Sequence, residues 1–451
     1  MLFLTNGTVV TGDGETVLHG ATVVVDAGRI VDVREGSISS GPEDEVIDLG
    51  GRLLVPGAIN AHAHGVVPCP LFASGAPALP IEQVLENLDR HLRGGTTTVL
   101  SVDGFNLPGE IEESNRLHPM NIKGGTTHFP LAFEAAHEAD GSGLTPDHES
   151  MTVEQMLELG AVAIAECGAG HTLAGGGQDY MYIPNAIEAE TGVRLEPKQA
   201  AALKYAVLGR RVQVDAYDAD RVSATLQDIG LAGRLTAERA REIIHQTVLP
   251  SFETALEGLR EGARLAVRYQ VPTMMHNSAP SETAIYDAAD IAGSLLICGH
   301  TNHTTFTVEE SVASARTLRE KGAVIEISVL DAFGARRSVQ DPEHIFALLA
   351  QDLVDIAATD YAGGYWDNLY FGMGHAVQAG VVSLPRAVAM CTRNVVQAFP
   401  QLAPERGEIA PGLIADLVVC DGQLQNVDLV FIDGRLVCEN GVVYRDNQGT
   451  A

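Results

Sequence analysis

Between about residue 55 and residue 404, short apolar runs alternate with longer stretches that have helical periodicity. This alternation predicts parallel β-strands joined by crossover helices. The candidate strands are Leu53–Gly65, Thr96–Ser101, Thr126–Phe133, Ala161–Glu166, Val271–His276, Ser294–His300, Ala323–Val329 and Val354–Asp360. Eight strands with helices between most of them predict an α/β fold of the (β/α)8 TIM-barrel type, whose functional groups lie at the C-terminal ends of the strands.

The two ends of the chain have a different pattern, in which short β-rich runs are separated by Gly-Asp, Asp-Gly and Asn-Gly turns. Such runs are typical of antiparallel strands. Neither end contains enough strands to enclose a core alone. We therefore predict one small β-sandwich built from residues 1–54 and 405–451, with the barrel of residues 55–404 inserted between them.

Metal-ligating residue types stand at the ends of five candidate strands. His62 and His64 are one residue apart, so on a strand both side chains point to the same face. The others are Glu166, His276, His300 and Asp360. Each alone has an ordinary explanation, such as a turn or a helix-cap neighbour. Their joint position at the catalytic end of a barrel instead predicts a metal site, since imidazole and carboxylate groups are common metal ligands.

Charge and composition narrow the classes of partner. The formal net charge is −30, which argues against nucleic acid and against anionic membrane surfaces, because both require cationic patches. No apolar run approaches the roughly 20 residues of a membrane span. The start of the chain lacks the basic segment of a signal peptide, and the 6 cysteines are scattered. We expect a cytoplasmic protein that acts on small molecules.

The motifs resemble those of the amidohydrolase superfamily of metal-dependent hydrolases. The resemblance rests on Val55-Pro56-Gly57 before His62-Ala63-His64, on the strand-end residues, and on the closing Ala410–Leu417 segment. The nearest similarity is to enamidase-like cyclic amide hydrolases. It rests on three short motifs: Glu166-Cys167-Gly168, His300-Thr301-Asn302 and Ile325-Glu326-Ile327.

The resemblance implies a ligand set for two divalent metal ions. It assigns one ion to His62 and His64 with Asp360, and the second to His276 and His300. The bridging group in the superfamily is a carboxylated lysine or a glutamate, and here Glu166 ends the fourth strand. Mixed nitrogen and oxygen ligands suit zinc, which we favour, and also iron, manganese or cobalt.

The ligand set predicts hydrolysis by a hydroxide that bridges the metals. The resemblance implies that the bond is a carbon–nitrogen amide bond, in a small cyclic amide, lactam or imide. Asp360 would take the proton of the hydroxide and deliver it to the leaving nitrogen. The alternative is a mononuclear deaminase of an amino-heterocycle, in which Glu166 has no metal role. A third hypothesis, a catalytically inactive binding or scaffold protein, would lack ligands, and none is missing.

A long segment separates Glu166 from His276, and it contains helical runs at about 170–255. A loop of this length is usually functional or forms a subdomain. We interpret it as a helical insertion over the barrel mouth or at a subunit interface, and we expect a homo-oligomer. Residues that follow the ligands should line the substrate pocket: Asn302, His303 and Tyr361, with Tyr365 and Trp366 beside them.

Overall fold

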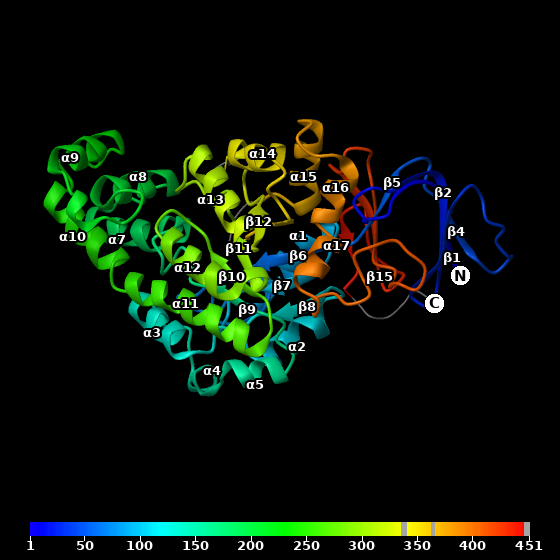
Figure 1. Cartoon of the computed structure of the whole chain (residues 1–451), viewed down its shortest axis with the longest axis horizontal. Coiled ribbons are helices and arrows are strands. Elements are labelled where there is room, and N and C mark those ends of the chain that lie inside the picture. The colour runs from blue at the N-terminus through cyan, green and yellow to red at the C-terminus, as the bar shows by residue number, and fades with distance from the viewer. Residues whose placement is uncertain (335–340, 362–365, 446–451) are drawn as a thin grey trace.

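The computed structural model describes residues 1–334, 341–361 and 366–445 of the chain. Figure 1 shows an elongated molecule with three parts in a row. A sheet formed by the two ends of the chain lies at one end, parallel strands surrounded by helices lie in the middle, and the helices α7–α10 lie at the other end. The parallel strands carry the candidate site.

The parallel strands form a three-stranded and a five-stranded sheet. Backbone hydrogen bonds join the two sheets at both edges, from Asp360 N to His62 O at 3.0 Å and from Thr126 N to Ala163 O at 2.9 Å. The first sheet contains β6 (Ala58–Ala63), β7 (Thr96–Ser101) and β8 (Asn121–Gly124); the second contains β9 (Ile164–Cys167), β10 (Thr273–His276), β11 (Leu296–Gly299), β12 (Val324–Ser328) and β13 (Ile356–Ala358).

The predicted third strand, Thr126–Phe133, is wrong. The strand at this place is β8, and the helix α3 (Pro130–Ala139) begins inside the predicted range. Pro130 favours the first turn of a helix, because its fixed φ suits that turn and its missing N–H has no partner there. Residues of β8 alternate between half-buried and buried positions, and the strand contains a single large apolar residue, so its sequence gives a weak signal.

The predicted first strand, Leu53–Gly65, is two strands. Its first part is β5 (Leu53–Pro56), which belongs to the terminal sheet, and its second part is β6. The chain crosses from one sheet to the other at Gly57, where a Cβ atom would lie 2.2 Å from Thr97 Oγ1. Only glycine permits this close approach.

Helices surround the parallel strands (Figure 1). Their apolar sides share one large core with the strands. Before the insertion these helices are α1 (Ile81–Arg93), α2 (Pro108–Leu117), α3, α4 (Pro146–Ser150) and α5 (Val153–Glu158); after it they are α11 (Phe252–Tyr269), α12 (Glu282–Ala292), α13 (Val308–Glu320), α14 (Pro342–Ala350), α15 (Leu369–Gln378), α16 (Leu384–Met390) and α17 (Arg393–Ala398).

Both ends of the chain contribute to one sheet, as the sequence predicts. Among the described residues, hydrogen bonds join all nine strands. In β5, Leu54 packs in a core within this sheet, whereas Leu53 and Val55 face the large core. The strands are β1 (Leu2–Val10), β2 (Val17–Asp26), β3 (Arg29–Glu35), β4 (Glu45–Asp48), β5, β14 (Leu417–Cys420), β15 (Val427–Ile432), β16 (Arg435–Glu439) and β17 (Val442–Val443).

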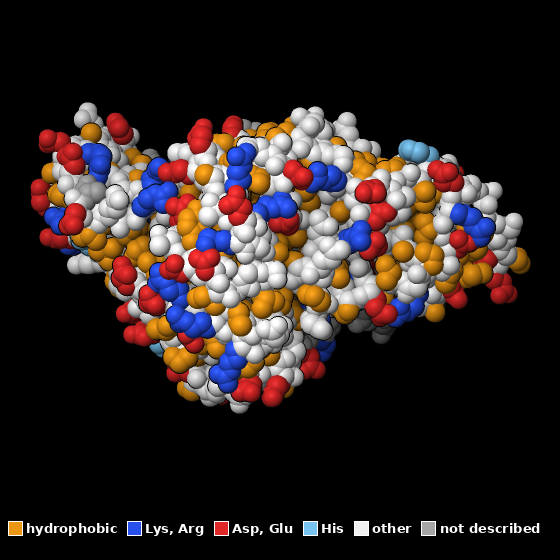
Figure 2. All heavy atoms as spheres, viewed as in Figure 1, with side chains coloured by type: hydrophobic (Ala, Val, Ile, Leu, Met, Phe, Trp, Pro, Cys, Tyr) orange, Lys and Arg blue, Asp and Glu red, His pale blue; other side chains and the backbone are white. Residues whose placement is uncertain are grey.

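The segment between β9 and α11 is helical. Its helices are α6 (Gly176–Tyr180), α7 (Tyr182–Thr191), α8 (Pro197–Leu208), α9 (Ala219–Asp228) and α10 (Ala237–Val248). Figure 2 shows acidic and basic side chains interspersed over the visible face of the molecule. Across the described residues, no helix is long and apolar enough to cross a membrane.

Candidate metal centre

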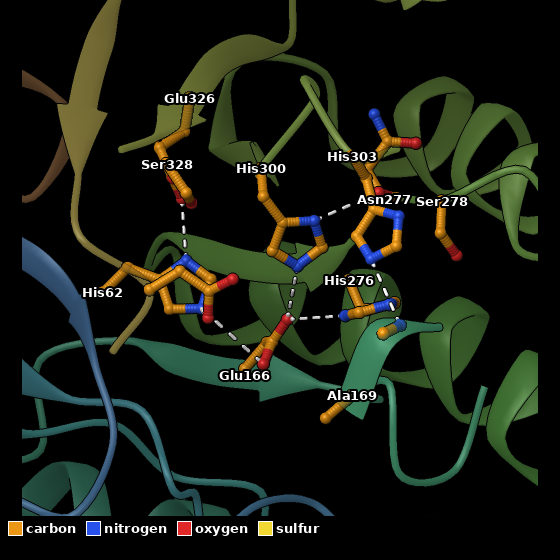
Figure 3. Close-up of polar contacts among 12 residues, drawn as sticks. His62, Glu166, Ala169, His276, Asn277, Ser278, His300, His303, Glu326 and Ser328 are labelled. Carbon is orange, nitrogen blue, oxygen red and sulfur yellow. Dashed lines mark hydrogen bonds and ion pairs between the residues drawn. The ribbon is translucent and has the colours of Figure 1, made fainter. Parts of the chain in front are cut away.

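Glu166 lies between His62 on one side and His276 and His300 on the other (Figure 3), and His64 is also near its carboxylate. One carboxylate oxygen, Oε1, is 3.3 Å from His276 Nδ1 and 3.3 Å from His300 Nε2. The other oxygen, Oε2, is 3.5 Å from His64 Nε2 and 3.7 Å from His62 Nε2. The four histidines and Glu166 come from the ends of β6, β9, β10 and β11. The carboxylate therefore divides its two oxygens between the two pairs.

Asp360 lies on the side of His62 and His64. Its Oδ1 atom is 3.3 Å from His62 Nε2 and 3.8 Å from His64 Nε2. The residue follows β13 with a φ of +51°, a left-handed conformation that aspartate tolerates better than most residues. The hydrogen bond from its backbone N–H to His62 O fixes this turn against β6, and the carboxylate is thereby directed toward the histidines.

The donor set fits divalent metal ions. His62 Nε2 is buried and has no hydrogen-bond partner among the described residues. Ligand atoms of His62, Glu166 and His300 lie within 4.8 Å of one another, as do those of His62, His64 and Asp360. The buried Glu166 and the half-buried Asp360 face imidazole nitrogens at 3.3–3.8 Å, which is the composition of a mixed nitrogen and oxygen metal site.

The protein groups raise the pKa of three of the four histidines, His300 among them, and lower that of His276. Burial disfavours protonation of His62 and His64. The neighbouring carboxylates overcome it, so that the pKa of His62 is raised well above its usual value and that of His64 is raised to about 9. Burial lowers the pKa of His276 to about 4. Burial also raises the pKa of Asp360, and a cation beside this carboxylate would lower it.

Two carboxylates that the sequence analysis did not assign hold His62 and His64. Glu326 on β12 accepts a hydrogen bond from His62 Nδ1 at 2.8 Å, and Asp103 accepts one from His64 Nδ1 at 2.9 Å. Both contacts turn the Nε2 atoms toward Glu166, the role that outer carboxylates commonly have around metal-binding histidines. Two features of the sequence could have identified these residues. Glu326 is an acidic residue inside a buried strand, and Asp103 stands two residues beyond the end of β7.

The second pair is held by neutral groups. His300 Nδ1 is 3.1 Å from the backbone oxygen of Asn277. A Cβ atom on Gly175 would lie 2.3 Å from His276 Nε2, so the glycine-rich loop of residues 168–177 rests directly on this imidazole. The N–H of Gly176 donates to His303 Nε2 at 3.2 Å. The loop that begins the insertion is therefore one wall of the second half of the site.

A buried lysine of the insertion holds this loop. Lys204 on α8 is 1% exposed and donates to the backbone oxygen of Gly175 at 3.0 Å. Its ammonium also forms an ion pair with Asp179 on α6 at 2.7 Å. Burial raises the pKa of Asp179 to about 6, although Lys204 opposes this shift. The sequence analysis missed Lys204 because its partners are determined by the tertiary fold.

Two of the predicted substrate residues have other partners. The amide of Asn302 pairs with the backbone of Ser328 on β12, at 2.9 Å for its Nδ2 atom and 2.8 Å for its Oδ1 atom. The hydroxyl of Tyr361 donates to Asn87 on α1 at 2.8 Å. Neither side chain is among those that line the cavity at the metal centre. These contacts hold Asn302 against β12 and Tyr361 against α1, and a part for either residue in substrate binding stays a prediction.

The other residues predicted to line the pocket, His303, Tyr365 and Trp366, differ in their position relative to the cavity. His303 lines the cavity, but Gly176 occupies its Nε2 atom and Thr305 its Nδ1 atom. The ring of Trp366 packs on Tyr361 with 3.4 Å between ring centres, away from the lining of the cavity. Tyr365 lies outside the described residues.

His171, to which the sequence analysis assigned no role, lies at the site. It lines the cavity together with Glu166, Asp360 and Phe72, and its ring stacks on Phe72 with 4.1 Å between centres. Phe72 in turn contacts His64 at 4.9 Å. Burial lowers the pKa of His171 to about 3, so this imidazole is neutral. The cavity itself encloses about 40 Å³, room for roughly three water molecules.

Comparison with known proteins places this arrangement in context. No protein-family profile matches the chain. Enamidase of Eubacterium barkeri is 24% identical over 169 residues, 36% of this chain and 41% of that protein. A 5-methylthioadenosine/S-adenosylhomocysteine deaminase of Bacillus cereus is 38% identical over 64 residues, 14% of this chain and 15% of that protein. The chain thus spans less than half the length of the curated relatives that it matches.

Solved structures match nearly the whole chain. The enamidase crystal structure, described as a member of the amidohydrolase superfamily, has a TM-score of 0.56 and 16% identity and covers 98% of this chain and 96% of that one. D-Aminoacylase, described with a binuclear metal centre, has a TM-score of 0.59 and 14% identity and covers 98% and 97%. At this level of identity, these likenesses show that the chain shares the fold of these proteins. Enamidase appears in both comparisons, as the short motifs predict.

Proposed function

We propose that the protein is a binuclear metal-dependent hydrolase that cleaves a carbon–nitrogen amide bond, on a closed (β/α)8 barrel. The observation that carries this proposal is the position of Glu166, whose two oxygens face different histidine pairs. His62, His64 and Asp360 would hold one ion and His276 and His300 the other, with Glu166 shared between them. Zinc is the metal that we favour, and iron, manganese and cobalt also suit these ligands.

The chemistry divides between the metals and the protein. Bound divalent ions lower the pKa of water and polarise a carbonyl group. Asp360 accepts the proton of the attacking water and passes it to the leaving nitrogen, since its carboxylate lies within reach of the same centre. Glu326 and Asp103 keep the Nε2 atoms of His62 and His64 directed at the metal. His171 and Phe72 exclude water from one side of the cavity.

The similarity to enamidase supports a small cyclic amide, lactam or imide as substrate. The second candidate is a deaminase of an amino-heterocycle, and it is favoured by the short similarity to 5-methylthioadenosine/S-adenosylhomocysteine deaminase. That reaction needs one metal and leaves the Oε1 atom of Glu166, with its two histidine neighbours, without a function. For this reason we prefer the amide hydrolase.

Product analysis distinguishes the two candidates. The metal-loaded protein would be incubated separately with hydantoin, dihydrouracil, glutarimide, 2-pyrrolidinone and 5-methylthioadenosine. The proposal predicts ring-opened carboxylate products from at least one cyclic amide and no ammonia from the adenosine. Ammonia from 5-methylthioadenosine, with every cyclic amide intact, would favour the deaminase.

Three further properties remain predictions. We propose the domain limits 1–54, 55–404 and 405–451, a helical insertion at about 170–255, and a homo-oligomer in the cytoplasm. Light scattering of the purified protein measures the oligomer directly, and a mass equal to a single chain of 47.7 kDa would contradict it.

A further inference from the structure

A second cavity adjoins the metal centre on the side of the insertion. It encloses about 310 Å³, compared with about 40 Å³ for the cavity at the metal ligands. Binding sites for small molecules typically occupy ~300–1,000 Å³, so the inner cavity has room for the reacting group alone. The body of any larger substrate must lie elsewhere, and the second cavity is large enough to hold it.

The two cavities share a wall. Gly176 and His303 line both of them, and the hydrogen bond between Gly176 N and His303 Nε2 lies at this boundary. A molecule with its amide group at Glu166 and its remaining part in the second cavity would therefore lie across these two residues. The second cavity is in this way an extension of the metal centre and not a separate surface pocket.

Helix α8 of the insertion forms the far wall of the second cavity. Pro197, Ala201 and Tyr205 line it, and their spacing of four residues places them on one face of the helix. The two alanines at positions 201 and 202 leave space in front of the helix. Thr304, next to His303, lines the opposite side, which belongs to the barrel.

The charged groups around this cavity are paired with one another. Lys198 lies 3.8 Å from Asp341 across the cavity, and the buried Asp179 is paired with Lys204. With both acids matched by lysines, the described residues of the lining offer no net charge to a ligand. The remaining contacts come mainly from proline, alanine and an aromatic ring, which favour an uncharged apolar or aromatic group.

We propose that the cavity between α8 and His303–Thr304 binds the non-reacting part of the substrate, and that this part is an uncharged apolar or aromatic group attached to the amide. This inference rests on the proposed metal-dependent amide hydrolysis. It also gives the insertion a function, because α8 would determine which amides reach the metals.

Hydroxamates test the proposal without requiring turnover, because they chelate divalent metals through two oxygens and can carry different tails. Binding of acetohydroxamate and of 4-phenylbutanohydroxamate to the zinc-loaded protein would be measured by calorimetry. The phenyl compound should bind at least about tenfold more tightly, since burial of an aromatic ring contributes at least this factor. Ala201→Phe should remove most of that advantage and leave the affinity for acetohydroxamate within about twofold.

A matched control is Ala224→Phe, the same substitution at an exposed position of α9, which should leave both affinities unchanged. If Ala201→Phe does not fold, Ala201→Leu fills less of the cavity and should cause an intermediate loss. Equal affinities of the two compounds for the unmodified protein, or an equal loss of both in Ala201→Phe, would overturn the proposed subsite alone. If neither compound binds the zinc-loaded protein, the metal centre itself is wrong, and this inference fails with it.

Discussion

The two histidine pairs of the candidate centre are supported in different ways. His62 and His64 each donate from Nδ1 to a buried carboxylate, and both carboxylates, Glu326 and Asp103, belong to the framework of parallel strands and the loops that follow them. His300 has a backbone oxygen behind it, and His276 lies against the glycine-rich loop of the insertion. One half of the site is built by the barrel framework, and the other half is completed by the insertion.

This difference has a consequence for metal binding. A carboxylate behind an imidazole increases its basicity and fixes its orientation, so the first pair, with Asp360, should hold its ion more tightly than the second pair. The second half depends on a loop that Lys204 and Asp179 keep in place. We expect the two ions to bind in sequence, with the second more sensitive to changes in the insertion.

Loss of the shared ligand should have the largest effect. Glu166→Gln keeps the size of the side chain but removes the negative charge that both halves use. At least one ion should be lost, and turnover should fall below about 1% of the wild-type value, because activation of water depends on the metals. Metal analysis beside a rate measurement tests this. Two tightly bound ions with undiminished turnover would eliminate the bridging role.

The next largest loss of turnover is expected on substitution of Asp360, which lies beside the first histidine pair alone. Asp360→Asn retains one oxygen but cannot carry the proton, and proton transfer by a positioned group is worth ~10²–10⁴ in rate. The variant should fold and retain the ion held by His276 and His300. A variant with more than about a tenth of wild-type turnover would assign the proton transfer to another residue. His303 is a poor second candidate, because both of its ring nitrogens are already hydrogen-bonded.

A smaller change in metal affinity should distinguish the two halves of the centre directly. Glu326→Gln removes the charge behind His62 and should weaken the first ion by roughly 10–100-fold. The matched control is Asn277→Ala, since His300 contacts the backbone oxygen of this residue, which alanine keeps. Metal titrations of both variants are the measurement. An equal loss of metal affinity in the two variants would show that the carboxylate of Glu326 does not strengthen binding of the first ion.

The smallest effect on the centre is expected from Lys204→Met. This change removes the contact with Gly175 and leaves Asp179 buried without its partner, so the protein should be destabilised by up to about 3–5 kcal/mol. In the folded variant the second ion should bind less tightly, by no more than about tenfold, and the first ion should be unaffected. Chemical unfolding and metal titration test the two parts separately. A weakened first ion would show that the halves are not independent.

Local patterns identified the side chains that meet at the candidate centre better than the side chains that support them. The alternation of a strand places His62 and His64 on one face, and barrel topology brings other strand ends to the same edge. Neither rule applies to Glu326, Asp103 or Lys204, whose partners are distant in the chain and meet only through tertiary packing. The same limit applies to Asn302 and Tyr361, whose partners are also distant in the chain. Their positions after ligands suggested a pocket, but their polar atoms bond to the framework.

Errors in the predicted strands have a related origin. An apolar run reveals burial, but it does not reveal which sheet buries it, so Leu53–Gly65 was predicted as one strand although the chain changes sheets at Gly57. The run at Thr126–Phe133 is apolar because it covers a buried turn and the start of α3. The turn patterns predicted strands at both ends of the chain, but such patterns do not specify how the strands pair.

A zinc titration of metal-free protein, followed by calorimetry, tests the account most directly. The account predicts two ions per chain, with the first bound more tightly than the second, and a single stoichiometric ion at most in Glu166→Gln. One ion per chain in the unmodified protein, or two ions that bind equally well with and without the Glu166 carboxylate, would contradict the shared metal centre.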